Sequence, residues 1–158
     1  EFFNSNELIS IVSYCNFKIS KYPSCWVKLE QIPTIVKKLT EYTGVNESHF
    51  ESANVVLYKE GSKHGPFYDA YDLNTETGKK YTASRGQRLK TLTFVMSNSI
   101  DISFPKLEKE EEYTLKNGDL LYYTNTSEGR NRNLAMEHML ENRTQSKTIL
   151  VNIYIREY

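Results

Sequence analysis

The sequence predicts a mainly β fold of the α+β type, a β-sandwich or jelly roll supported by helices near the N-terminus. A helical spacing of apolar residues follows Pro33, but from residue 51 onward the hydrophobic period changes to two. The chain also contains 12 tyrosines, a residue type enriched in strands. Its 158 residues can bury a substantial core, so we expect a single domain spanning residues 1–158.

The expected elements follow in order along the chain. Two short extended segments, 9–12 and 17–19, precede a helix that begins at Pro33, buries Ile35, Val36 and Leu39 and ends at Gly44. Strands are expected at 55–58, 91–96, 101–104, 112–115, 120–123 and 148–155. The second of these is almost continuously apolar, which indicates a central position in its sheet. The residues 116–119, Lys-Asn-Gly-Asp, are typical of a hairpin turn and lead into the strand 120–123.

Composition narrows the possible functions. With 20 basic and 20 acidic residues the formal net charge is +0, so nothing indicates binding to nucleic acid or to a membrane surface. We see no apolar stretch of membrane-spanning length and no signal-peptide pattern, and therefore expect a soluble chain of undetermined compartment. Cys15 and Cys25 could pair, but the sequence favours two separate thiols. Asn46, Asn125 and Asn142 each begin an Asn-x-Ser/Thr sequence, which leaves glycosylation open.

Two residues far apart in the sequence suggest a metal site. Asp69 and His138 each lie near a strand end, and a small jelly roll can bring such positions together inside its barrel. Two histidines and one carboxylate, with the other positions open, suit a non-haem Fe(II) centre. A basic residue deeper in the barrel, such as Lys147 before the final strand, could then hold a dicarboxylate as a desolvated point charge.

Several segments occur in a recognisable order: "SCWV" with "IVKKLTEYTGV", "ESANVVLYKEGSKHGPFYDAYD", "GQRLKTLTFVMSN", "FPKL", "KNGDLLYYTN", "EHML" and "KTILVNIYIRE". Together they resemble the catalytic domain of the prolyl 4-hydroxylase family, over nearly the whole chain. The resemblance implies a double-stranded β-helix, or jelly roll, with N-terminal support helices. It also implies Fe(II), 2-oxoglutarate and ascorbate as cofactors, and a proline-rich or collagen-like peptide as substrate.

The resemblance also implies roles for individual residues. Asp69 and His138 would be metal ligands. Tyr58 and Lys147 would hold 2-oxoglutarate, although Lys147 lies one residue closer to the histidine than is usual in the family. Thr91 would form part of the pocket wall.

One position departs from the family pattern. The family's metal motif is His-x-Asp, usually after a proline, and in "PFYD" Phe67 occupies the histidine position. A phenyl ring has no lone pair, and losing a ligand should cost at least the roughly 10–100-fold typical of losing a supporting residue. His64 could substitute only if a bulge near Gly65 redirected its imidazole, because His64 and Phe67 lie on opposite faces of a regular strand.

Two functions therefore remain open at the level of sequence. The first is a 2-oxoglutarate-dependent dioxygenase that hydroxylates peptidyl proline, or lysine, with an incomplete metal triad. The second is an inactive homologue that keeps the jelly roll as a peptide-binding or scaffolding module.

Overall fold

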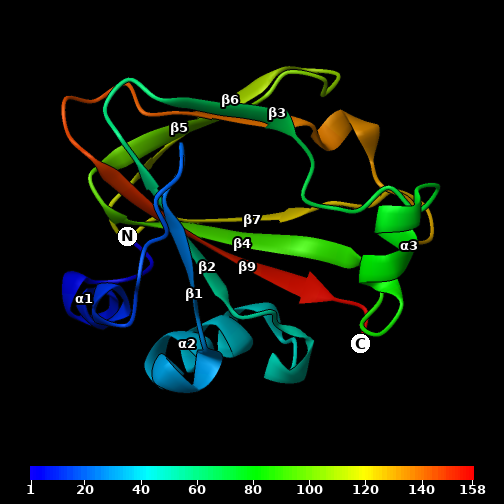
Figure 1. Ribbon diagram of the computed structural model, residues 1–158, viewed down its shortest axis with the longest axis horizontal. Helices are drawn as coiled ribbons and strands as arrows, with labels where there is room; N and C mark the ends of the chain where they lie inside the picture. Colours follow the sequence, from blue (N-terminus) through cyan, green and yellow to red (C-terminus); the bar gives the residue numbers. More distant parts are fainter.

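A computed structural model describes residues 1–158 and contains two antiparallel sheets (Figure 1). The larger sheet has the strand order β1-β2-β9-β4-β7 and consists of β1 Ser24–Val27, β2 Ala53–Tyr58, β9 Thr148–Arg156, β4 Arg88–Ser97 and β7 Leu120–Thr124. The smaller sheet has the order β3-β8-β5-β6 and consists of β3 Lys63–Phe67, β8 His138–Glu141, β5 Ser99–Phe104 and β6 Glu111–Lys116. The helices are α1 Ser5–Ser13, α2 Pro33–Thr43 and α3 Glu76–Thr82, with short 3-10 turns η1 Leu29–Gln31, η2 Glu47–His49 and η3 Leu134–Met136. The predicted mainly β architecture is confirmed.

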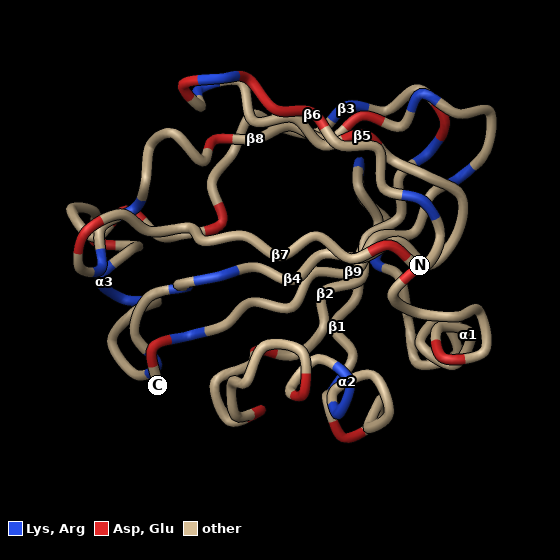
Figure 2. Tube along the Cα trace, turned by 180° about the vertical axis from the view of Figure 1, so that it is seen from behind, with Lys and Arg blue, Asp and Glu red and all other residues tan.

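The two sheets form separate layers. Figure 1 shows α1 and α2 beneath the larger sheet, on the side away from the smaller one, and α3 beyond its end. In Figure 2, seen from behind, basic and acidic residues are distributed along the whole trace. This agrees with the formal net charge of +0.

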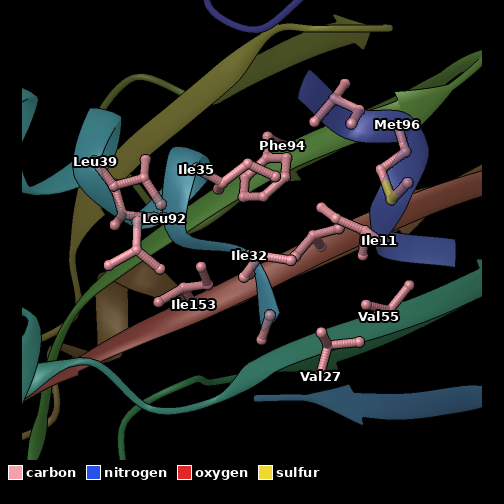
Figure 3. Packing of buried hydrophobic residues seen from close by; sticks show 14 of the residues in the cluster. Ile11, Val27, Ile32, Ile35, Leu39, Val55, Leu92, Phe94, Met96 and Ile153 are labelled. Atoms are coloured by element: carbon pink, nitrogen blue, oxygen red, sulfur yellow. The ribbon is translucent and has the colours of Figure 1, made fainter. Parts of the chain in front are cut away.

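One hydrophobic cluster lies between the helices and the larger sheet. Leu8 and Ile11 of α1 and Ile35 and Leu39 of α2 are each at most 1% exposed. Figure 3 shows this packing, with α2 and α1 side chains directed at residues of the strands, among them Leu92, Phe94 and Ile153. Fully burying an aliphatic side chain of this size contributes roughly 1.5–3 kcal/mol, so the helices are held by their apolar faces.

A second cluster fills the space between the two sheets. It joins Val56, Val95 and Leu150 of the larger sheet to residues of the smaller sheet, Ile100, Ile102, Phe104, Leu115 and Leu140. On β9, Leu150 belongs to this inner cluster whereas Val151 and Ile153 belong to the helix-facing one. Because side chains alternate along a strand, the register of each strand determines which residues reach the interior.

The helix ends follow their capping residues. As predicted, α2 begins at Pro33, and its last residue, Thr43, is followed by the cap Gly44, which has a φ of +70°. The predicted strand 9–12 is wrong, because these residues belong to α1. Asn4 Oδ1 accepts from the backbone of Glu7 at 3.0 Å, and the Glu7 carboxylate accepts from the backbone of Asn4 at 2.8 Å. This capping box starts a helix. The apolar run 9–12 is too short to distinguish the period of a helix from that of a strand.

The turn at 116–119 is present, but it does not make a hairpin. Strand β6 pairs with β5, and β7 pairs with β4 in the other sheet, so the turn carries the chain from one sheet to the other. Gly118 has a φ of +91°, and a Cβ there would lie 2.3 Å from the Phe3 carbonyl oxygen. The glycine is therefore required by the close approach of the N-terminal segment, whose Phe2 and Phe3 amides donate to the Gly118 carbonyl.

The expectation of two separate thiols is wrong, since Cys15 and Cys25 form a disulfide with a Cα–Cα separation of 5.6 Å. The loop between them folds back on itself through a bridge between Lys18 and Ser24, which brings its ends together. None of the helices is long and apolar enough to cross a membrane.

Candidate functional site

Asp69 and His138 meet between the two sheets. Asp69 follows β3, and His138 is the first residue of β8, which pairs with β3. Asp69 Oδ1 lies 3.5 Å from His138 Nε2, and the residues are 7% and 2% exposed. The structure therefore brings these two candidate metal ligands together, as a small roll allows.

The Asp69 carboxylate is held in place by neighbouring polar groups. The hydroxyls of Thr91 and Tyr123 donate to Asp69 Oδ2 at 2.8 and 2.6 Å. Asn125 Nδ2 in turn donates to Thr91 Oγ1 at 2.8 Å. Thr91 thus lines the site, and its contact is to the carboxylate. Tyr123 and Asn125 were missed at the level of sequence; only the alternation of the strand that ends at Thr124 could have indicated an inward-facing Tyr123.

The protonation states of the pair follow from this environment. Burial alone would raise the pKa of Asp69, but the contact with His138 and the hydrogen bonds from Tyr123 and Thr91 hold it below its usual value. Burial would lower the pKa of His138, but Asp69 and the Met136 carbonyl raise it above its usual value. His138 Nδ1 lies 2.9 Å from the Met136 carbonyl oxygen. Because a carbonyl only accepts, Nδ1 carries a proton and Nε2 is the atom that faces Asp69.

Phe67 occupies the position opposite His138. The two residues are Cα partners in the β3–β8 register, and their ring centroids lie 4.5 Å apart in an edge-on arrangement. The centroid of the Phe67 ring also lies 4.6 Å from that of the His64 ring. The phenyl ring is therefore in contact with both imidazoles.

His64 points inward, contrary to the expectation from regular alternation. The register shifts between His64 and Phe67, so a bulge puts both side chains on the inner face of β3. His64 does not join Asp69 and His138, however. Its Nδ1 lies 2.8 Å from the Tyr58 hydroxyl, and its ring stacks on Tyr22 at 4.0 Å.

The two residues expected to hold 2-oxoglutarate lie in different environments, one buried and one exposed. Tyr58 is buried on the inner face of the larger sheet, where burial and then Asp69 raise the pKa of its hydroxyl. Lys147 is exposed, in a surface hollow of about 610 Å³ that it shares with Lys59, Glu60, Gln145 and Ser146. The Cα partner of Tyr58 on β9 is Thr148, which is 0% exposed and donates to the Ser99 carbonyl at 2.6 Å. The expectation that Lys147 lies inside the roll is therefore not met: the inward position belongs to the next residue.

These residues do not complete a three-ligand metal site. Asp69 and His138 supply two donors, and no group of at least three His, Cys, Asp or Glu side chains converges anywhere in the chain. The side chain of Thr93 on β4 has a buried hydroxyl oxygen without a hydrogen-bond partner, but it adds no His, Cys, Asp or Glu donor to the pair. The side chains present thus supply two of the three donors that such a metal site needs.

Comparisons with known proteins agree with the fold. No family model matches the chain. Probable prolyl 4-hydroxylase 3 of Arabidopsis thaliana is 33% identical over 69 residues, which make up 42% of this chain and 22% of the plant protein. The matched part of the chain therefore spans about a fifth of the length of that relative.

Solved structures give a wider match at lower identity. Viral collagen prolyl hydroxylase from Paramecium Bursaria Chlorella virus-1, in its 2OG complex, has a TM-score of 0.77 and 20% identity, with coverage of 99% of this chain and 92% of the viral one. Oxalate oxidase in complex with glycolate has a TM-score of 0.52 and 11% identity, and the match covers 94% of this chain and 58% of the enzyme. At these identities the likeness establishes the fold, a jelly roll of the kind found in these enzymes, and agrees with the predicted double-stranded β-helix.

Proposed function

We propose that this chain is a prolyl-hydroxylase-like jelly-roll module that binds an extended peptide without hydroxylating it. One observation carries the proposal: Phe67 stands opposite His138, with the ring centroids 4.5 Å apart. A phenyl ring has no lone pair for a metal, so the site has two protein donors where a facial triad has three.

The inner end of the site supports the same conclusion. The resemblance to prolyl 4-hydroxylases assigns the cosubstrate carboxylate to a lysine, but Lys147 is exposed and the inward position is held by Thr148. A threonine hydroxyl carries no charge to offset that of a buried carboxylate, and its proton is already donated to the Ser99 carbonyl. The site therefore lacks both a third protein donor for a metal and a buried positive charge for the carboxylate of the cosubstrate.

Tyr68, Arg132 and Leu134 lie together beside the site, and we infer that they form the rim that contacts the peptide. Tyr68 precedes Asp69 in sequence, and its hydroxyl donates to the Leu134 carbonyl at 3.0 Å. The Arg132 guanidinium lies 4.2 Å from the Tyr68 ring centroid, and Leu134 is 60% exposed. Proline-rich segments dock on aromatic side chains, and their polyproline II conformation is already formed before binding. A proline-rich or collagen-like peptide is therefore the class of partner to test.

The test measures peptide binding and turnover separately. A fluorescent proline-rich peptide should bind without added metal or 2-oxoglutarate, and Tyr68→Ala should weaken binding at least about tenfold, as for a hot-spot residue. Tyr81→Ala is the matched control, because Tyr81 is 52% exposed but lies on α3. With Fe(II), 2-oxoglutarate and ascorbate present, no peptide-dependent succinate should form. Peptide-dependent succinate release would refute the inactive assignment, and absence of peptide binding would refute the module.

The second candidate is a 2-oxoglutarate-dependent dioxygenase acting on peptidyl proline or lysine with Fe(II), 2-oxoglutarate and ascorbate. The observation that favours it is the retained pair, in which His138 Nε2 lies 3.5 Å from Asp69 Oδ1. The contact of Nδ1 with the Met136 carbonyl is the supporting bond commonly made by metal-ligating histidines. This reading requires succinate formation that depends on the peptide and disappears in His138→Ala.

A further inference from the structure

The three Asn-x-Ser/Thr sequences of this chain lie in different environments. They begin at Asn46, Asn125 and Asn142. Asn46 is exposed, whereas Asn125 and Asn142 are 2% and 0% exposed. The three asparagines could not be distinguished from the sequence alone, but they differ in how deeply each is buried.

The two buried asparagines have structural roles that a glycan would destroy. Asn125 Nδ2 donates to Thr91, the residue that positions the Asp69 carboxylate. Asn142 Nδ2 donates to the carbonyls of Tyr58, Lys59 and Ser146 at 2.9–3.2 Å. A sugar attached to either nitrogen would remove these hydrogen bonds and would have no space in the interior.

Asn46 has the opposite properties. It caps the turn η2 by accepting from the backbone of Ser48 through Oδ1 at 2.9 Å, and its Nδ2 makes no hydrogen bond. The Ser48 side chain is exposed, and its hydroxyl also has no partner in the chain. Asn46 borders an open hollow of about 580 Å³ next to α2, which lies on the side of the larger sheet away from the smaller sheet (Figure 1). A glycan here would leave the candidate site uncovered.

The disulfide indicates a compartment in which this modification occurs. Both cysteines of the chain are joined, and none is free. Disulfides persist mainly in secreted proteins and in the endoplasmic reticulum, and are rare in reducing compartments. The same oxidising pathway modifies Asn-x-Ser/Thr sequences on protein surfaces.

We propose that Asn46 is an N-glycosylation site and that Asn125 and Asn142 are not modified in the folded protein. The donor is a polyprenyl-diphosphate oligosaccharide. Asn46 Nδ2 loses a proton and forms a bond to the anomeric carbon of the sugar, while the bond from that carbon to the diphosphate oxygen breaks and polyprenyl diphosphate leaves. The inference does not depend on whether the candidate site turns over a substrate.

The experiment uses the full chain, expressed behind a cleavable secretory signal in eukaryotic cells. Intact mass and peptide mapping before and after peptide N-glycosidase treatment locate each glycan, and hydrogen exchange or circular dichroism checks the fold. The secreted protein should carry one glycan, on Asn46. It should be lost in Asn46→Gln and in Ser48→Ala, and retained in the matched control Ser127→Ala, which removes the sequence beginning at Asn125 without altering that side chain.

Two results would overturn the proposal. One is folded, secreted protein without a glycan on Asn46. The other is a glycan on Asn125 or Asn142, either in secreted protein or in protein retained in the cell with Asn46 unmodified.

Discussion

Replacing Phe67 by histidine should restore metal binding, because the position already faces the other two ligands. The Phe67 Cα is the register partner of the His138 Cα, and the two rings are in contact at 4.5 Å. Asp69 and His138 present Oδ1 and Nε2 only 3.5 Å apart. An imidazole at position 67 would add the third donor of a two-histidine, one-carboxylate site.

The expected gain can be bounded. Loss of a supporting partner costs about 10–100-fold in affinity, and a direct ligand should be worth at least the upper end of that range. Phe67→His should therefore bind Mn(II) at least about 100-fold more tightly than the unchanged chain, which corresponds to about 2.8 kcal/mol. Isothermal titration of metal-free protein measures this directly, and Mn(II) avoids the air oxidation of Fe(II).

Two variants make the result interpretable. Phe67→Leu removes the aromatic ring without adding a donor, and it should bind Mn(II) no better than the unchanged chain. Asp69→Asn introduced together with Phe67→His should lose most of the gain, because a carboxylate ligand is removed. If folded Phe67→His bound Mn(II) no better than Phe67→Leu, or if the unchanged chain already bound it equally well, Phe67 would not be the defect in this site.

Three further predictions concern stability, each measured by urea unfolding. The pKa of His138 is raised on folding, so the contribution of this residue to stability is complete below the ordinary histidine pKa of about 6.5 and is lost as pH rises through the higher folded value. The difference in unfolding free energy between the unchanged chain and His138→Gln should therefore shrink over that range. A difference that does not depend on pH would contradict this prediction. Reduction of the Cys15–Cys25 disulfide, which closes a loop with a sequence separation of 10, should lower the unfolding free energy by about 3 kcal/mol and have no effect on the double serine variant. Lys147→Ala should change the unfolding free energy by less than about 0.5 kcal/mol. Thr148→Val should lower it by about 1–2 kcal/mol, because the hydrogen bond to the Ser99 carbonyl is lost. Equal costs for the two variants would contradict the observed orientation of the two side chains.

Elements with long, regular patterns were predictable from sequence. The helix from Pro33 to Gly44 has both end signals and a continuous apolar face, and the segments 91–96 and 148–155 have enough apolar residues to require strands. The segment 9–12 was mispredicted because its few apolar residues fit either period, and the capping box at Asn4 and Glu7 outweighed them. Local signals thus predict elements well where several of them agree.

The candidate site was predictable only in part, for a geometric reason. Asp69 and His138 could be identified as possible ligands, and the replacement of a histidine by Phe67 is visible in the letters "PFYD". Lys147 was expected in the interior from its position before the final strand and from the family resemblance, but the register of β9 against β2 directs Thr148 inward. The bulge in β3 likewise turned His64 to the same face as Phe67.

The chain's own residues therefore specified its class of fold, the ends of its main helix and the identity of the groups available for chemistry. The pairing of strands specified which of those groups meet. In a sheet, side chains alternate every residue, so a one-residue shift or a single bulge reverses the face on which a side chain lies. Such shifts depend on contacts between segments far apart along the chain, and local sequence carries little information about them.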